Sequence, residues 1–322
     1  AYRHFSDYDT FIPSSVERLT IYGDGEFSCY YGSPIDNNLC ADIEEICLEG
    51  FDRIGAYAFS RCKKTKQIRI PSSVTEIGKY AFFSCSGLTS IEIPSSVTEI
   101  GEGAFYGCKG LTSIEIPSSV TEIGGSAFYG CKGLTSFEIP SSVTEIGEYA
   151  LSYCTGLTSI EIPSSVTEIG EGAFYGCKGL TSIEIPSSVT EIGGSAFYGC
   201  SGLTSFEIPS SVTKIEEEMF ENCVELKSIQ LPSTITEIQT GAFRNCRKLS
   251  DISIPSNVKE IGEGVFCGCE SLVSITIPEG VTELWGGESD GEGETGVFAE
   301  CINLERVILP STLVSIGGHA FA

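Results

Sequence analysis

Hydrophobic and polar positions alternate in short stretches along the chain. In the stretch LTSIEI, Ile91 and Ile93 alternate with Ser90 and Glu92. This alternation predicts a short β-strand with one buried face. Pro94 follows directly and is expected to end the strand, because proline has no N–H for a central ladder.

The residues after this strand predict a turn, a second extended piece and a third, compact segment. Ser95 and Ser96 favour a turn, and Gly101 and Gly103 favour the next corner. The apolar residues beyond Gly103 have near-helical spacing, which predicts a short helical turn. We expect these side chains of one repeat to be buried: Ile91, Ile93, Val97, Ile100, Ala104, Phe105, Cys108 and Leu111.

This pattern repeats every 23 residues. Ten prolines keep the interval, from Pro71 to Pro278, and ten cysteines keep it from Cys62 to Cys269. A period of this length indicates a solenoid, in which each coil buries its apolar face against its neighbours. The 322 residues therefore predict one repeat domain rather than two globular ones.

The repeat weakens toward both ends, which suggests the domain boundaries. Residues 1–47 fit poorly and are interpreted as an N-terminal cap with a partial repeat. Residues 48–322 are expected to form about eleven coils, with an acidic insertion at 285–293 and a partial last coil.

The frame L-x-x-I-x-I-P-x-x-V-x-x-I-G-x-x-A-F-x-x-C closely resembles the BspA-like leucine-rich repeat class. The resemblance implies an α/β repeat solenoid: a right-handed leucine-rich-repeat stack with a parallel β-sheet, short second strands and short helical turns. Members of the class are typically cell-surface or secreted proteins of bacteria and of some parasitic protists. Some are linked to adhesion through host matrix or plasma proteins. The resemblance therefore implies a protein ligand and a location at or beyond the cell surface.

The net charge narrows the possible partners. A formal charge of −25 argues against nucleic acid and against anionic membrane surfaces, which attract Lys and Arg. No run of 18 apolar residues exists, so no membrane insertion is expected. The first residues do not resemble a signal peptide. The sequence leaves open whether a targeting signal was removed during maturation.

Outward glutamates recur at two positions of the coil. One column consists of Glu92, Glu115, Glu138, Glu161, Glu184 and Glu207, and the other of Glu76, Glu99, Glu122, Glu145, Glu168 and Glu191. Such columns serve solubility and protection against association, or they form a surface for a basic partner or divalent cations. The first column is preceded by Arg69 and followed by Gln230, and a binding footprint is expected at such a break.

Eleven of the fifteen cysteines share one position of the repeat. A buried column of thiols explains them better than a metal array or a thiol relay, since no coil except the one with Cys267 and Cys269 supplies the second nearby Cys or His that a zinc site needs. Cys29, Cys40, Cys47 and Cys267 lie outside the column. Either Cys29 and Cys40 form a disulfide, which would imply an oxidising compartment, or all four are free thiols.

The acidic insertion contains the only tryptophan, Trp285. Its alternating carboxylates and glycines suit a solvent loop, with calcium binding as the alternative. An exposed Trp285 would make an adhesive anchor.

Catalysis finds no support in the sequence. The two histidines, His4 and His319, lie near opposite ends of the chain, and no nucleophile–histidine arrangement or phosphate loop is present. We therefore expect no enzyme and no cofactor.

The most regular part of the chain is a copied block. Residues 94–139 and 163–208 differ only at Lys132 and Ser201. The sequence thus predicts a non-catalytic recognition or adhesion module that binds a macromolecular partner through its outward residues. The alternative is an architectural rod or spacer with binding carried elsewhere.

Overall fold

The computed structural model describes residues 17–27, 43–287 and 296–322. They belong to two compact units, Ala1–Ser165 and Val166–Ala322, and each unit is described by itself. The described residues form β-strands joined by tight turns.

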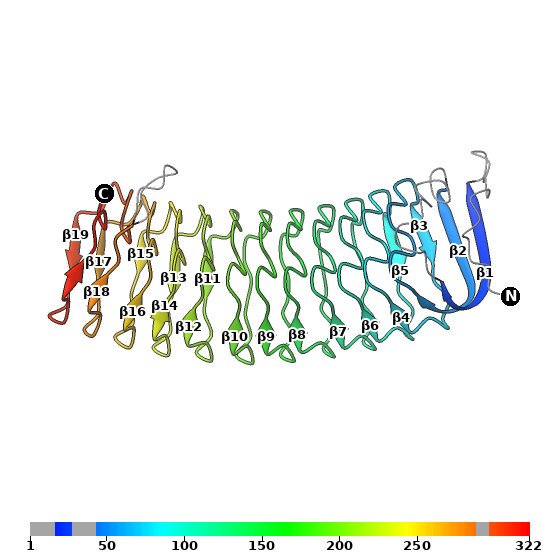
Figure 1. The fold of residues 1–322 in the computed structure, drawn as a ribbon, viewed down its shortest axis with the longest axis horizontal. Helices are drawn as coiled ribbons and strands as arrows, with labels where there is room; N and C mark the ends of the chain where they lie inside the picture. Colours follow the sequence, from blue (N-terminus) through cyan, green and yellow to red (C-terminus); the bar gives the residue numbers. More distant parts are fainter. Residues whose placement is uncertain (1–16, 28–42, 288–295) are drawn as a thin grey trace. The chain divides into compact units, whose positions relative to one another are not determined.

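Unit 1 begins with two long parallel strands and continues as coils with short strands. Its strands are β1 (Arg18–Phe27), β2 (Glu45–Ile54), β3 (Gln67–Arg69), β4 (Glu76–Ile77), β5 (Ser90–Glu92), β6 (Glu99–Ile100), β7 (Glu122–Ile123) and β8 (Glu145–Ile146). Strand β2 pairs with β1, with β3 and with β4, so its two halves start two rows of strands. One row continues from β3 to β5 and the other from β4 through β6 to β7, as Figure 1 shows. The predicted boundary at residue 47 lies inside β2.

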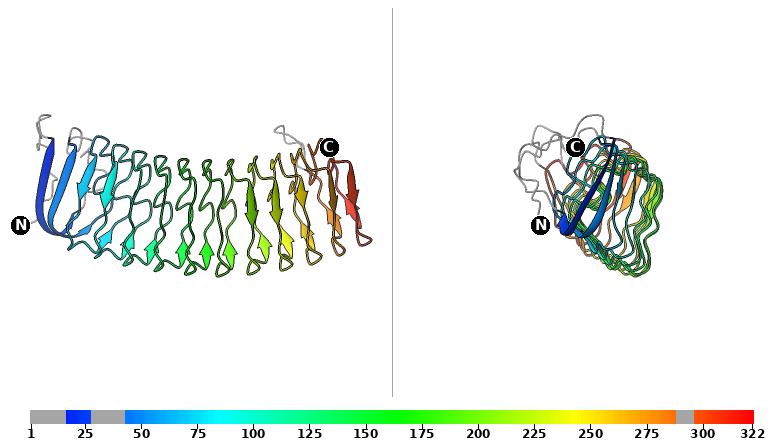
Figure 2. Two further views of the ribbon diagram at one scale, coloured as in Figure 1. Left: turned by 180° about the vertical axis from the view of Figure 1, so that it is seen from behind. Right: turned by 90° about the vertical axis from the view of Figure 1, so that its right-hand side faces the viewer.

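Unit 2 repeats the two rows. Its strands are β9 (Glu168–Ile169), β10 (Glu191–Ile192), β11 (Ser205–Glu207), β12 (Lys214–Ile215), β13 (Ser228–Gln230), β14 (Glu237–Ile238), β15 (Asp251–Ile252), β16 (Glu260–Ile261), β17 (Ser274–Thr276), β18 (Glu283–Leu284), β19 (Arg306–Ile308) and β20 (Ser315–Ile316). One row pairs β11, β13 and β15, and the other pairs β12, β14 and β16 (Figure 2, left). Every pair is parallel, and partners such as Ile238 and Ile261 are one repeat apart.

The predicted α component and its helical turns are not confirmed, because the described residues contain no helix. The backbone N–H of Cys85 donates to the carbonyl of Phe82, three residues back, whereas that of Phe82 donates to Ala104 in the next coil. Tyr80 and Ser84 have φ values of 54° and 57°, which interrupt any helical run. An α-helix needs consecutive bonds to the fourth preceding carbonyl, so this segment is a series of tight turns that bonds its neighbours.

The predicted core is confirmed. All eight side chains expected to be inside the coil are buried, with exposed fractions between 0% and 7% across the copies of that coil at 91–111 and 114–134. The phenylalanine rings stack along each unit: centroids of Phe82 and Phe105 are 5.0 Å apart, and those of Phe105 and Phe128 are 5.2 Å apart. Successive coils thereby share one continuous apolar interior.

The cysteine column is buried as predicted except at Cys301, which is only partly buried, and its thiols also satisfy backbone carbonyls. The Sγ of Cys108 donates to the carbonyl of Phe82 at 3.2 Å, and Cys131 repeats the contact with Phe105. Cys62 differs from the expected buried thiol, because it is disulfide-bonded. Cys47 and Cys267 are thiols, which is compatible with both alternatives for the four cysteines outside the column. The proposed Cys29–Cys40 disulfide lies outside the described residues.

The second serine of the Pro-Ser-Ser turn joins neighbouring coils. The Oγ of Ser165 donates to the carbonyl of Val143 at 2.7 Å in unit 1, and Ser188 donates to Val166 at 2.7 Å in unit 2. The sequence predicts only a turn for these serines. Their hydrogen bonds satisfy a carbonyl that the short strands leave outside the ladder.

Candidate interaction surfaces

The first glutamate column lies on the outward face of the first strand row. The buried neighbours Ile91 and Ile93 are each 6% exposed, so the pleat directs Glu92 away from the core. In unit 1, Glu92 is aligned with Glu115, and Glu138 with Glu161. All six glutamates of the column are exposed: Glu92, Glu115, Glu138 and Glu161 in unit 1, and Glu184 and Glu207 in unit 2.

The column does not converge on a centre. In unit 2, Glu207 is aligned with Gln230, so the acidic row ends there as the sequence indicates. Among the described residues, no group of three or more His, Cys, Asp or Glu side chains is placed to hold a metal ion. The arrangement is a row of regularly spaced, exposed carboxylates.

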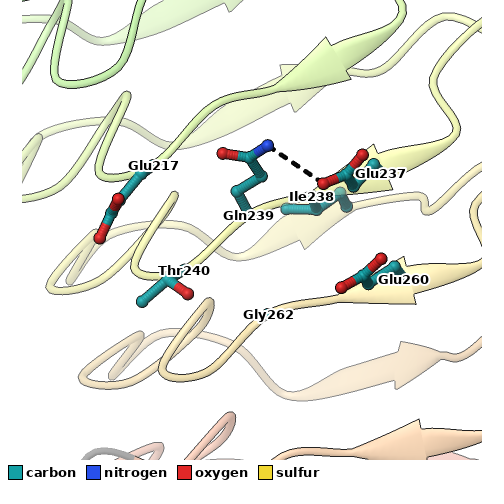
Figure 3. Close-up of a pocket in the computed structure, with 7 residues that line it drawn as sticks. All are labelled: Glu217, Glu237, Ile238, Gln239, Thr240, Glu260 and Gly262. Atoms are coloured by element: carbon teal, nitrogen blue, oxygen red, sulfur yellow. Dashed lines mark hydrogen bonds between the residues drawn. The ribbon is translucent and has the colours of Figure 1, made fainter.

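The second column changes its character in unit 2. Lys214 stands where the preceding coils have glutamate, and its Nζ lies 2.9 Å from the Oε2 of Glu237. Gln239 donates from Nε2 to the Oε1 of the same residue at 3.0 Å (Figure 3). The hydrogen bond from Lys214 is the main cause that lowers the pKa of Glu237.

A shallow pocket of about 200 Å³ opens at this change. It is lined by Glu217, Glu237, Ile238, Gln239, Thr240, Glu260 and Gly262. Figure 3 shows the carboxylates of Glu237 and Glu260 side by side on adjacent strands, with Glu217 on a neighbouring turn. Gln239 stands at the position where most coils have glycine, so its side chain forms part of the wall.

A second irregularity in unit 2 lies beside the core. Tyr175 and Tyr198 stack with centroids 4.4 Å apart, and the same repeat position is then taken by Glu221, Arg244 and Cys267. Glu221 is 8% exposed, and its Oε2 has no hydrogen-bond partner in the described part of the chain. Burial raises the pKa of Glu221 to about 7, against the lowering effect of Arg244. Glu221 and Arg244 were not among the predicted site residues, although their departure from tyrosine in a regular column is a visible sequence signal.

Trp285 follows strand β18 and is 43% exposed. Its carbonyl accepts a hydrogen bond from the N–H of Val297 at 3.3 Å. The predicted calcium-binding alternative depends on carboxylates at 288–294, which lie outside the described residues.

His319 lies at the end of unit 2, with a φ of 61°, and His4 lies outside the described residues. No described helix is long and apolar enough to cross a membrane.

Comparisons with known proteins agree with the fold. The family model for the BspA type leucine rich repeat region matches residues 52–181, 167–287 and 293–322, with six copies. A leucine-rich repeat protein from Bacteroides ovatus is 30% identical with a TM-score of 0.60, over 83% of this chain and 79% of that chain. A leucine rich cell surface protein from Faecalibacterium prausnitzii is 32% identical with a TM-score of 0.59, over 83% of this chain and 87% of that one.

A third solved structure shares the fold alone. The pneumococcal vaccine antigen PcpA is 20% identical with a TM-score of 0.58, over 92% of this chain and 78% of that chain. The search of curated proteins found no match. The matched family model covers well over half of the residues, and the chain therefore belongs to the BspA-type leucine-rich repeat family.

Proposed function

We propose that the protein is a non-catalytic recognition module, displayed at a cell surface or secreted, that binds a protein partner through its outward residues. The observation that carries the proposal is the contrast between a regular buried frame of apolar residues and exposed columns with local breaks. Hydrophobic burial determines the frame, whereas the outward residues are free to vary. The family membership supports the same class of function, because leucine-rich repeats are interaction modules.

The proposed contact residues are Glu92, Glu115, Glu138, Glu161, Glu184, Glu207 and Trp285. A regular row of carboxylates favours a basic or extended partner that makes many weak contacts. Host matrix or plasma proteins are the partner class that the resemblance suggests. Divalent cations remain a second proposed ligand of the acidic columns.

Two observations support the proposed location outside the cytoplasm. One similar solved structure is described as a cell surface protein. The disulfide at Cys62 fits an oxidising compartment, since cytosolic thiols are kept reduced.

A second candidate function is an architectural rod or spacer. The nearly identical blocks 94–139 and 163–208 favour it, because they repeat the same surface without a unique feature. In that case binding is carried by segments other than the regular coils.

The two functions separate in a binding experiment with purified plasma and matrix proteins on a biosensor. The first variant replaces Glu92, Glu115 and Glu138 with glutamine, and the matched control replaces Glu99, Glu122 and Glu145 in the same three coils. Recognition through the first column predicts weaker binding for the first variant alone. Equal affinity of both variants and the native chain, or no saturable partner, would support the spacer.

A further inference from the structure

Unit 1 carries an unusual group of cations at one corner of its coils. The segment Arg61–Arg69 reads RCKKTKQIR, with five cations in nine residues, although the whole chain has only 19 Lys and Arg. We define the basic corner as Arg61, Lys63, Lys64, Lys66, Lys109 and Lys132. All six side chains are exposed. A cationic segment of this density in an acidic chain is a candidate site for a polyanion.

The cations from different coils lie in register. Lys109 and Lys132 occupy the same repeat position in consecutive coils, and Lys63 occupies it two coils before Lys109. The coils are joined at this corner by the N–H of Thr112, which donates to Thr89, and by that of Thr135, which donates to Thr112. At a coil spacing of about 4.8 Å, Lys63 and Lys132 are about 15 Å apart along the row.

The basic corner keeps its positive charge. Within the described residues, Arg61, Lys63, Lys109 and Lys132 form no ion pair. Lys66 is paired, with its Nζ 2.8 Å from the Oε1 of Glu44. The corner segments at 84–91, 107–114 and 130–137 contain no Asp or Glu, and the acidic column begins only at the strand position of Glu92. The equivalent corners of unit 2 include Glu225, Asp251 and Glu270. These unit 2 corners also contain cations, but Arg247 is paired with Glu270 and Lys248 with Glu225. Lys109 and Lys132 of unit 1 have no such carboxylate in their corner segments.

We propose that the basic corner binds a linear sulfated polysaccharide. Sulfate groups spaced along a sugar chain match a straight row of lysines, and each contact is a charge-assisted hydrogen bond. Exposed threonines border the row, and the Oγ1 of Thr89 already donates to the carbonyl of Lys66 at 3.2 Å. Its oxygen is left to accept hydrogen bonds from sugar hydroxyls.

The aromatic residues of the same coils argue against a nucleic acid at this corner. Single-stranded nucleic acid is held by bases that stack on open aromatic faces. Here Tyr106 stacks on Tyr129 with centroids 4.4 Å apart, and on Phe83 with centroids 5.2 Å apart. The ring faces are thus occupied by one another, whereas a sulfated sugar chain needs only the cations and hydroxyls.

The copied block supplies a matched control for the test. Lys109 and Lys178 lie in identical sequence, since residues 94–116 and 163–185 are the same. Lys109 has Lys132 in the next coil of unit 1, and Lys178 has Ser201 in the next coil of unit 2. Lys109→Gln and Lys178→Gln therefore make the same local change, but only the first lies in the basic corner.

The experiment measures binding of a heparin octasaccharide by isothermal titration calorimetry with the full chain at 0.15 M NaCl. We expect the double variant K109Q/K132Q to bind about tenfold more weakly, as two lost charge-assisted contacts imply. K178Q is expected to keep the native affinity, and dextran, an uncharged polysaccharide, should not bind. Circular dichroism verifies that each variant keeps the native spectrum, and the affinity of the native chain should fall with rising salt.

Three results would overturn the proposal. They are absence of octasaccharide binding by the native chain, equal weakening by K178Q and K109Q, and tighter lysine-dependent binding of a single-stranded RNA of similar charge. The last result would assign the basic corner to nucleic acid.

Discussion

At the residue scale, Glu221 lies outside the acidic columns and differs from their exposed glutamates because it is buried. Its Oε1 accepts a long hydrogen bond of 3.4 Å from the Nδ2 of Asn222, and its Oε2 has no partner among the described residues. Arg244 lies in the next coil, but its Nε is also buried without a partner there. A carboxylate in such surroundings favours the protonated form.

This burial predicts a pH-dependent stability for unit 2. The pKa of Glu221 is raised from 4.5 to about 7 by burial, with Glu218 adding to the rise and Arg244 opposing it. Because the pKa is higher in the folded state than in the unfolded state, the contribution of Glu221 to the free energy of unfolding is complete below pH 4.5. This contribution is lost as the pH rises toward 7. Glu221→Gln should remove up to about 3 kcal/mol of this pH dependence. Hydrogen exchange of the segments around 216–226, measured from pH 4.5 to 7.5, checks the prediction, with rates corrected for the intrinsic effect of pH.

Glu225→Gln serves as the control, because Glu225 is less buried and is paired with Lys248 at 2.7 Å. A native-like pH profile for the Glu221 variant would contradict the prediction.

The buried thiols make a second prediction at this scale. Burial raises the pKa of Cys131 to about 12, so its thiolate is scarce at pH 8. Iodoacetamide should therefore modify Cys131 in the native protein far more slowly than in the denatured protein. Mass spectrometry of proteolytic peptides resolves each site, and the half-buried Cys47 gives the comparison. Rapid native labelling of Cys131 would show that the column opens readily.

At the element scale, the sequence predicts the buried frame of a coil but not its backbone. The spacing of apolar residues along the sequence predicts which side chains are buried. The structure buries the residues that this spacing selects in one coil: Ala104, Phe105, Cys108 and Leu111. The same spacing fits a helical turn and a series of tight turns, since both bring residues three or four apart to one side. Only the hydrogen bonds between coils, such as the one from the N–H of Phe82 to the carbonyl of Ala104, show that the segment is a series of tight turns. Such contacts are not visible in one coil's sequence.

The sequence predicts some features of the candidate surfaces but not others. The outward direction of Glu92 follows from strand alternation, and its alignment with Glu115 follows from the 23-residue period. The pocket beside Gln239 and the burial of Glu221 depend on how irregular side chains fill space, which periodicity does not determine. Likewise, the 23-residue period predicts a thiol at Cys62, as at the other positions of the cysteine column, and does not predict its disulfide.

The phenylalanine stack allows a test of the coil as an element. Phe105 is fully buried between Phe82 and Phe128, so Phe105→Ala should cost about 3–5 kcal/mol through lost contacts and a cavity. Phe105→Leu should cost less, because Leu151 fills the same position in another coil and is only 1% exposed. Urea denaturation followed by circular dichroism measures both changes. Equal losses for alanine and leucine would indicate that stacking, rather than filled volume, stabilises the coil.

At the scale of the whole molecule, the net charge of −25 is distributed unevenly. Outward glutamates repeat along the strands, whereas the basic corner lies in unit 1. Charges of one sign about 5 Å apart repel by roughly 1 kcal/mol per pair in water-like surroundings. The fold tolerates this cost because the buried frame repeats in every coil. The repulsion also opposes association between copies of the protein.

This repulsion predicts that salt stabilises the protein. Raising NaCl from 20 mM to 500 mM shortens the screening length from about 20 Å to about 4 Å, which weakens repulsion along the glutamate columns. The midpoint of thermal unfolding should therefore rise with salt, and the rise should be smaller for E115Q/E138Q, which removes two adjacent charges. Glu44→Gln is the opposite control, because Glu44 attracts Lys66 across 2.8 Å and its loss removes a favourable pair. That variant should be no more stable than the native chain at low salt, and its response to salt should be undiminished. Differential scanning calorimetry at both salt concentrations measures each effect. A midpoint that falls with salt would mean that ion pairs such as Lys79–Glu102 outweigh the repulsion between the columns.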